Sequence, residues 1–182
     1  MKKLSLLAGL VLMLFLTSCR DIVNSVLDVL PPFEVPFTTQ LEVPFASVST
    51  TSYTKTPDIP MNIDLDAKIK QNDPRFSINN LKSVQLSSLS IDYVSSSLGN
   101  KLDVIKNARI YLKAPNKEEI LIATSYNNTN PDTIVFTPTD ADVLEYFRTN
   151  QNDLVIEIQG SRITADKITM KLNTGFKVKV QL

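Results

Sequence analysis

Period-two alternation of apolar and polar residues most constrains what this chain of 182 residues can fold into. Residues 176–182 are apolar at every second position, and residues 63–70 alternate in the same way. Successive side chains of a β-strand point to opposite faces, so the pattern predicts half-buried strands of an antiparallel sheet. Asn72-Asp73-Pro74 and Leu98-Gly99-Asn100 supply turns between such segments.

The rest of the chain continues this pattern, with one interruption. A short helix is expected where Thr139 or Asp140 can cap it and Asp142 lies in its first turn, with Val143, Leu144 and Phe147 facing inward. In residues 81–93 the alternation slips between Leu86 and Leu89, which indicates a bulge, and Gly175 indicates a bulge or bend. Further strands are expected at residues 104–112, 119–124, 133–137, 154–158 and 168–172.

About eight strands, one short helix and no alternation of strands with helices predict an all-β fold over residues 34–182. The two architectures that fit this pattern are an antiparallel sandwich of two packed sheets and a barrel formed by one closed sheet. Long strands with slips can pass between two sheets, so we favour an antiparallel β-sandwich.

A four-residue repeat opens this region. Glu34-Val35-Pro36-Phe37 recurs eight residues later as Glu42-Val43-Pro44-Phe45. Proline cannot donate a hydrogen bond to a ladder, so the repeat predicts an edge strand or the start of a strand.

Composition excludes several kinds of chemistry. The chain has no histidine, which removes the commonest general base and metal ligand. Its four glycines are far apart, so no phosphate-binding loop is present. The 19 basic and 19 acidic residues form no basic stripe, which argues against a nucleic-acid partner. We therefore expect no cofactor, no metal and no catalytic residues, and we do not expect an enzyme.

The N-terminus has the organisation of an export signal. Met1-Lys2-Lys3 is followed by an apolar run over residues 4–16, and Leu16-Thr17-Ser18-Cys19 ends with the chain's only cysteine. This order resembles the lipobox of bacterial lipoproteins. The resemblance implies cleavage after residue 18 and acyl chains on Cys19, so the lipid bilayer becomes a partner. The remaining 164 residues carry a net charge of −2, and with Cys19 acylated no cysteine is left for a disulfide.

Residues 19–33 are expected to be the acylated cysteine and a tether. Apolar residues at helical spacing between residues 22 and 30 could lie on the membrane, pack on the domain or form a linker. In lipoprotein sorting an aspartate directly after the cysteine commonly signals inner-membrane retention, and here that residue is Arg20. The resemblance therefore favours the outer membrane, with a periplasm-facing domain slightly preferred over a surface-exposed one, while a Gram-positive host stays open.

Three positions are candidate sites. Asp64 and Asp66, on one face of an expected strand, could contribute to a Ca²⁺ site, but the clean alternation favours a solvated face. Tyr126 and Asn127 lie in an Asn-rich loop and are a tentative ligand-binding loop. Asp132-Thr133-Ile134 resembles an O-glycosylation acceptor of some Gram-negative anaerobes, but a match this short often arises by chance, so a plain turn followed by a strand is preferred.

The sequence predicts a membrane-anchored lipoprotein that acts as a non-catalytic binding or assembly module in the bacterial envelope, with a protein complex there as its partner. The first alternative is a surface-exposed binder of carbohydrate or a host protein. The second is a hydrolase that uses carboxylates.

Overall fold

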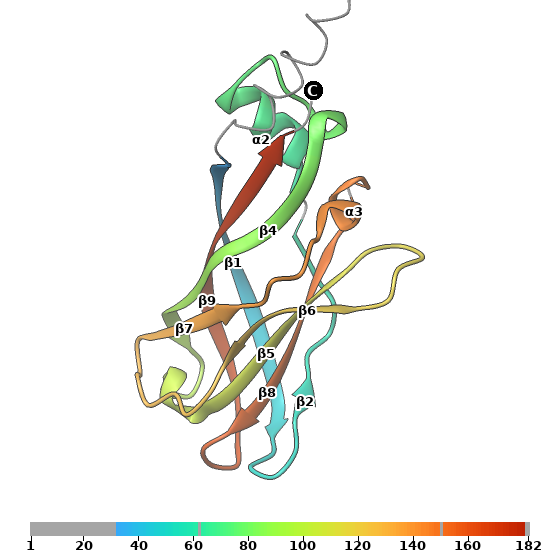
Figure 1. Ribbon diagram of the computed structural model, residues 1–182. Helices are drawn as coiled ribbons and strands as arrows, with labels where there is room; N and C mark the ends of the chain where they lie inside the picture. The colour runs from blue at the N-terminus through green and yellow to red at the C-terminus, as the bar shows by residue number, and fades with distance from the viewer. Residues whose placement is uncertain (1–31, 62, 150, 181–182) are drawn as a thin grey trace, which may run out of the picture.

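The computed structural model describes residues 32–61, 63–149 and 151–180, which form nine strands and a few short helices (Figure 1). In chain order the strands are β1 Phe33–Val48, β2 Thr54–Lys55, β3 Ile59–Pro60, β4 Leu81–Ser96, β5 Ile105–Lys113, β6 Ile120–Ser125, β7 Thr133–Pro138, β8 Asp153–Gly160 and β9 Thr164–Val180. The helical segments are α2 Leu65–Asn72 and α3 Leu144–Phe147, with 3₁₀ turns η1 Ile78–Asn80 and η2 Leu102–Val104.

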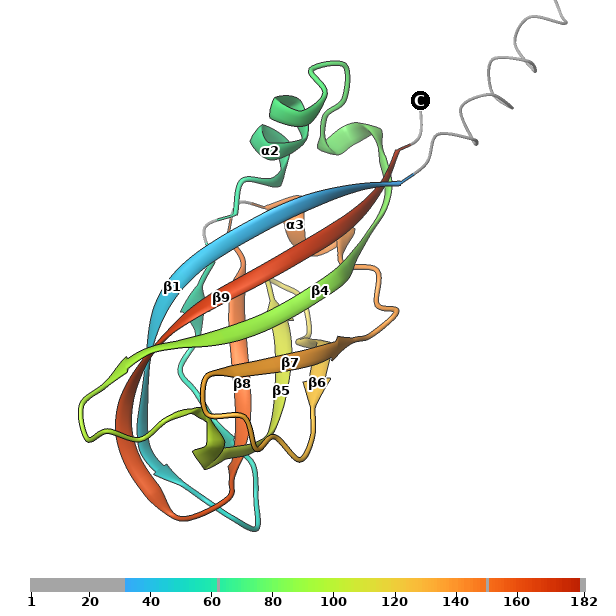
Figure 2. The ribbon, with the colours of Figure 1, turned by 90° about the vertical axis from the view of Figure 1, so that its left-hand side faces the viewer.

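The strands form two packed layers that share one hydrogen-bonded path. All pairings are antiparallel, and the order is β1-β9-β4-β7-β6-β5-β8-β2, with β3 also paired to β8. Strand β7 joins the layers because it pairs with β4 and with β6. Figure 2 shows β1, β9 and β4 running diagonally across β8 and β5. The all-β antiparallel sandwich expected from the sequence is confirmed.

Apolar residues from both layers meet in the core. Burying each large side chain contributes about 1.5–3 kcal/mol, which makes this interior the main source of stability. The expected inward face of β5 is confirmed, because Ala108, Ile110 and Leu112 are buried. A small gap between the layers is lined by residues of both: Val43, Ile91, Ile105, Ala108, Ile134, Phe136, Ile156, Ile158 and Met170.

Strand β9 is longer than the sequence indicates. The two strands expected at residues 168–172 and 176–182 are one element, and β9 continues through Gly175 as an interior strand between β1 and β4. The β4–β9 pairing has three register shifts, and the one between Leu86 and Ser88 lies where the slipped alternation of β4 predicts a bulge. A Cβ at Gly175 would lie 2.7 Å from Ser88 Oγ, so the bulged strand approaches here because the side chain is missing.

Residues 63–70 were expected to be a strand, and this prediction is wrong. The structure forms helix α2 there, with Leu65 and Ile69 buried. These two residues are four apart, a spacing that a strand and a helix both place on one face. Ala67 separates the two readings, because a strand would bury it and the structure exposes it. Asp64 decides the outcome by capping the helix, since its carboxylate accepts a 2.9 Å hydrogen bond from Ala67 N.

The second helix, α3, is shorter than expected and has a different start. Its N-cap is Val143, and neither Thr139 nor Asp140 caps it. Asp142 precedes the helix, and its Oδ1 accepts hydrogen bonds from Leu144 N at 3.1 Å and Val84 N at 3.0 Å. The same carboxylate therefore starts α3 and fastens it to β4. The inward stripe is buried as expected: Val143, Leu144 and Phe147.

The expected signal and tether, with Cys19, lie almost wholly outside the described residues, which start at Pro32. Strand β1 begins, and β9 ends, at the end of the molecule that carries α2 (Figures 1 and 2). No helix within the described residues is long and apolar enough to cross a membrane.

Candidate functional site

Four connections gather at the end of the molecule opposite α2 (Figures 1 and 2). They are residues 49–53, 97–104, 126–132 and 161–163, which we call the loop end. Binding residues are often carried by loops positioned on a rigid scaffold, so this end is a candidate site.

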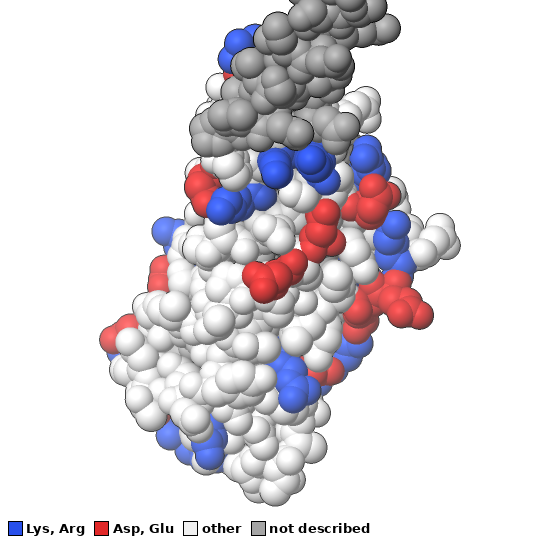
Figure 3. Space-filling view, in the orientation of Figure 1, with Lys and Arg blue, Asp and Glu red and all other residues white. Residues whose placement is uncertain are grey.

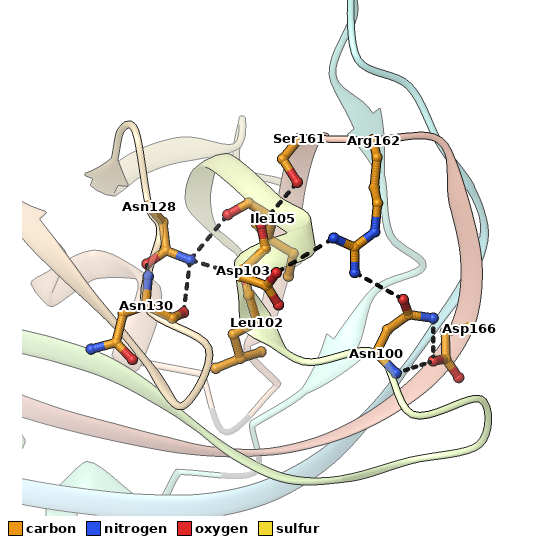
Figure 4. Close-up of polar contacts among 9 residues, drawn as sticks. All are labelled: Asn100, Leu102, Asp103, Ile105, Asn128, Asn130, Ser161, Arg162 and Asp166. Atoms are coloured by element: carbon orange, nitrogen blue, oxygen red, sulfur yellow. Dashed lines mark hydrogen bonds and ion pairs between the residues drawn. The ribbon is translucent and has the colours of Figure 1, made fainter.

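A buried carboxylate holds the first of these loops in place. Asp166 is only 6% exposed and accepts hydrogen bonds from Leu98 N at 3.0 Å, Asn100 N at 3.2 Å and Asn100 Nδ2 at 2.8 Å. Figure 4 shows Asp166 against Asn100. Between the two anchored residues Gly99 adopts φ 80°, a conformation that glycine reaches without strain.

Arg162 ties the turn between β8 and β9 to the same loop. Its guanidinium donates to Asn100 Oδ1 at 3.2 Å and to Asp103 Oδ2 at 3.5 Å (Figure 4). The neighbouring Ser161 donates from its hydroxyl to Asp103 O at 2.9 Å. Two loops that are far apart in the sequence are thus joined by three contacts.

Asn128 holds the loop after β6. Its Nδ2 donates to Leu102 O at 2.9 Å and to Ile105 O at 3.1 Å (Figure 4). Its backbone N–H donates to Lys106 O at 2.8 Å. Asn130 Oδ1 closes the next turn by accepting hydrogen bonds from the backbone N–H groups of Asp132 and Thr133, at the start of β7. The loop end is therefore fixed by side-chain hydrogen bonds as well as by the strands.

Large apolar side chains project from this braced end. Leu98 is 73% exposed, Tyr126 57% and Ile163 78%, and together they are three of the five exposed large apolar residues in the described part of the chain. Many of the nearby charges are paired, as in Lys101 with Asp132 at 2.7 Å. Toward this end the face in Figure 3 is largely uncharged. Apolar groups held on rigid loops are suited to contact another surface.

A second cluster adjoins the loop end on the outer face of β5 and β8. Arg109 Cζ lies 4.0 Å from the ring centroid of Tyr53, and its Nη1 lies 3.7 Å from Glu157 Oε2. Tyr111 donates from its hydroxyl to Glu157 Oε2 at 3.0 Å. We call Tyr53, Arg109, Tyr111, Tyr126 and Glu157 the tyrosine–arginine cluster.

The pKa values of this cluster follow from its contacts. Burial lowers the pKa of Arg109, but Tyr53 and the hydroxyls of Tyr126 and Tyr111 outweigh it, so the pKa is raised. Burial, followed by the hydrogen bond to Glu157, raises the pKa of Tyr111. Arg109 therefore stays a cation and Tyr111 a neutral phenol near neutral pH, so the cluster offers aromatic faces around a fixed positive charge.

The two residues of the candidate ligand-binding loop, Tyr126 and Asn127, have different roles in the structure. Tyr126 is exposed and belongs to the tyrosine–arginine cluster. Asn127 has φ 54°, and its amide donates to Asn107 Oδ1 at 2.9 Å, so its position is explained by the turn. Tyr126 is the member of the pair available for a ligand.

The tripeptide Asp132-Thr133-Ile134 lies where the loop enters β7. Thr133 Oγ1 donates to Asp92 Oδ1 at 2.9 Å, and Ile134 is buried. The hydroxyl that resembles a glycosylation acceptor is therefore engaged with β4, an arrangement that suits a turn followed by a strand.

The proposed face of Asp64 and Asp66 does not exist, because both carboxylates serve helix α2. Asp66 accepts from Lys70 Nζ at 2.5 Å and from Ile78 N at 2.8 Å. These two hydrogen bonds, led by the one from Lys70, lower the pKa of Asp66. Within the described residues no three Asp, Glu, His or Cys side chains are grouped to hold a metal.

Sequence reasoning missed Arg109, Glu157 and Asp166. Alternation places Arg109 and Tyr111 together on the outer face of β5, and that signal was available. Glu157, the carboxylate that both side chains contact, could be identified only from the pairing of β5 with β8, which places Arg109 opposite Glu157. Such a register depends on contacts between distant segments, and the sequence pattern does not fix it.

Comparisons with known proteins assign no family. No protein-family profile matches the chain, and no curated protein matches its sequence. Among solved structures it is similar to the SPBc2 prophage-derived protein YomS, with 13% identity, 78% of this chain and 95% of that chain covered, and a TM-score of 0.29. A chain of desmodium yellow mottle tymovirus is 9% identical, with 84% of this chain and 90% of that chain covered and a TM-score of 0.27. FLHE is 6% identical, with 80% of this chain and 98% of that chain covered and a TM-score of 0.25. These TM-scores are too low to support an inference about this chain.

We expect Asp166→Asn to loosen the loop end in a pH-dependent way. Burial would raise the pKa of Asp166, but hydrogen bonds from Asn100, Lys167 and Leu98 outweigh it, so the pKa lies below its usual range. The stabilisation is present above the unfolded-state pKa of about 4 and is lost as pH falls through the lower folded-state pKa. Urea midpoints of the two proteins should differ at pH 7 and converge at low pH. A constant difference would show that this carboxylate contributes nothing through its charge.

Proposed function

We propose that the chain is a lipid-anchored, non-catalytic binding module of the bacterial envelope, held by Cys19 and contacting a protein complex through the loop end. The observation that carries the proposal is the exposure of Leu98, Tyr126 and Ile163 on loops that are fixed by hydrogen bonds. Fixed loops lose little conformational entropy on binding, so exposed apolar groups on them are suited to recognition.

The position of the start of β1, at the end of the molecule opposite the loop end, supports the proposed anchor at Cys19. Fourteen positions separate Cys19 from Phe33, a reach of at most about 50 Å for a fully extended chain. Strand β1 is 16 residues long and starts at the end opposite the loop end (Figure 1). An anchor at Cys19 would therefore be attached through the end of the molecule opposite the loop end. The outer membrane and a periplasm-facing domain, which rest on Arg20, stay part of the proposal.

A protein is the partner that suits this surface best. The loop end carries Lys101 and Arg162, and both are paired with acidic groups, Asp132 and Asp103. Nucleic acids and anionic lipid surfaces are bound through unpaired basic residues, whereas protein interfaces are depleted of charge at their centres.

We expect Ile163→Ser and Leu98→Ser to weaken capture of the envelope partner strongly. Loss of a hot-spot residue at the centre of an interface costs about 2 kcal/mol or more, or about 30-fold in affinity. The measurement is recovery of the crosslinked complex with the tagged, lipidated chain from envelopes. Val135→Ser is the matched control, because Val135 is 71% exposed on β7 and Ile163 is 78% exposed.

The control separates a specific surface from general hydrophobicity. Substitutions at exposed positions change stability by about 0.5 kcal/mol or less, so all three variants should stay folded. Equal recovery with Ile163→Ser, Leu98→Ser and the unchanged chain would contradict a role for the loop end. Equal loss with Val135→Ser would contradict its specificity.

The tyrosine–arginine cluster favours a second function, a surface-exposed binder of carbohydrate or of a host protein. Tyrosine faces can stack on a sugar or a peptide, and Arg109 would supply hydrogen-bond donors beside them. Tyr126→Ala and Arg109→Lys would then abolish retention on a glycan or peptide array. Unchanged retention would reject this alternative.

A further inference from the structure

Strand β1 has an open edge whose hydrogen-bonding direction can be worked out. Among the described residues it lies at the end of the strand order and pairs with β9 alone, in an unbroken register from Phe33 to Phe45. In an antiparallel ladder, alternate residues point their N–H and C=O groups toward one neighbour and the rest toward the other side. One half of the β1 residues therefore directs its backbone away from the sheet.

A hydrogen bond elsewhere in the sheet identifies that half. Tyr93 N donates to Asp132 O at 2.8 Å, and this position continues the β4–β7 register, so the odd-numbered residues of β4 face β7 there. The even-numbered ones consequently face β9. In this part of the β4–β9 register the even-numbered residues of β4 lie opposite odd-numbered residues of β9, so the even-numbered residues of β9 bond to β1. In the β1–β9 register these lie opposite the odd-numbered residues of β1, which are therefore the ones bonded to β9. The even-numbered residues face the open edge.

This assignment explains the repeated proline. Pro36 and Pro44 are both even-numbered, so neither removes a bond from the ladder with β9. Between them the backbone N–H groups of Thr38, Gln40 and Glu42 face the open edge by the same assignment. Helix α2 lies beside residues 34–36, where it shares a hollow with β1, so this window starts beyond the helix.

We propose that β1 pairs antiparallel with β1 of a second copy, about a two-fold axis at Gln40. Pro36 and Pro44 each lie four residues from Gln40, so the axis sets them opposite each other at the two ends of the window. Gln40 then faces Gln40 of the second copy, and Thr38 faces Glu42 of the second copy. All three outward amides of each chain meet a carbonyl, which makes an uninterrupted ladder.

The side chains are compatible with this pairing. Thr38, Gln40 and Glu42 are exposed on one face, and the axis sets no like charges directly opposite each other. Glu42 already has a counter-ion, because its carboxylate lies 2.5 Å from Lys167 Nζ. An open edge of this kind is a template for strand pairing, and the two prolines confine the pairing to one short window.

Cysteine crosslinking of the full chain in envelopes tests the register. Opposite Cα atoms of a hydrogen-bonded pair are about 5.5 Å apart, within disulfide reach, so Gln40→Cys should give a covalent dimer under mild oxidation. Thr38→Cys is the matched control, since the two copies of residue 38 would be about 13 Å apart or more. The double variant Thr38→Cys, Glu42→Cys should crosslink again. The unchanged chain measures the background from Cys19.

Each outcome decides the proposal. Dimer from Gln40→Cys and the double variant, with Thr38→Cys at background, supports it. Equal crosslinking by Thr38→Cys, absence of dimer from Gln40→Cys, or an adduct of a different mass overturns it. As a second readout, Gln40→Pro should convert dimer to monomer in native mass measurements while β-sheet circular dichroism is unchanged, with Gln40→Thr remaining dimeric. A Gln40→Pro protein that stays dimeric would also overturn the proposal.

Discussion

Replacing Cys19 by alanine is expected to move the chain from the membrane fraction to the soluble fraction almost completely. The sulfur of Cys19 is the atom that would carry a diacylglyceryl group. Each buried methylene contributes about 0.8 kcal/mol, and two or more acyl chains give stable anchoring. Fractionation of cells that express each chain measures the effect, and the mass of the purified N-terminal peptide reports acylation.

Ser18→Ala is the matched control, because it keeps a small residue before the cysteine and leaves the sulfur in place. That variant should remain in the membrane fraction. If Cys19→Ala fractionates like the unchanged chain, the N-terminus is an ordinary secretory signal or an anchor of another kind, and the lipoprotein interpretation is wrong.

Replacing Phe176 by alanine is expected to lower the free energy of unfolding by about 3–5 kcal/mol, a large share of a domain's stability. Phe176 lies in β9 and is 1% exposed. Its ring packs edge-to-face on Phe147 of α3, with centroids 5.0 Å apart at an interplanar angle of 75°. Urea unfolding followed by circular dichroism measures the change.

A double-mutant cycle separates the ring pair from general cavity formation. Phe147→Ala alone should also destabilise the chain strongly, and the double variant should cost less than the two single changes together. Strictly additive losses would show that α3 and β9 are not coupled through these rings. Val135→Ala, on the exposed outer face of β7, should change stability by about 0.5 kcal/mol or less.

Most of the fold could be predicted because half-buried strands leave a clear sequence pattern. Strands β4 to β8 lie close to where alternation and turn residues place them. The failure at α2 has a definite cause, since Leu65 and Ile69 fit a strand and a helix equally well. Only the cap formed by Asp64 and the exposure of Ala67 separate the two.

The candidate site could be predicted only in part. The loop around Tyr126 was expected from its asparagines, which do form turns, as Asn128 and Asn130 show. Nothing in the sequence distinguishes Asp166, because its partners are nearly 70 positions away. The tyrosine–arginine cluster likewise depends on strand register. Local patterns place residues on faces, and distant pairing brings those faces together.

The most direct test of the account is photocrosslinking of the lipidated chain in cells, with the reactive residue at Ile163 on the loop end or at Asn72 at the end of α2. Ile163 is expected to give one adduct with an envelope protein, and this adduct should disappear with Cys19→Ala, whereas Asn72 should give none. An adduct from Asn72 together with none from Ile163 would contradict it, because the partner would then bind the end of the molecule where β1 begins.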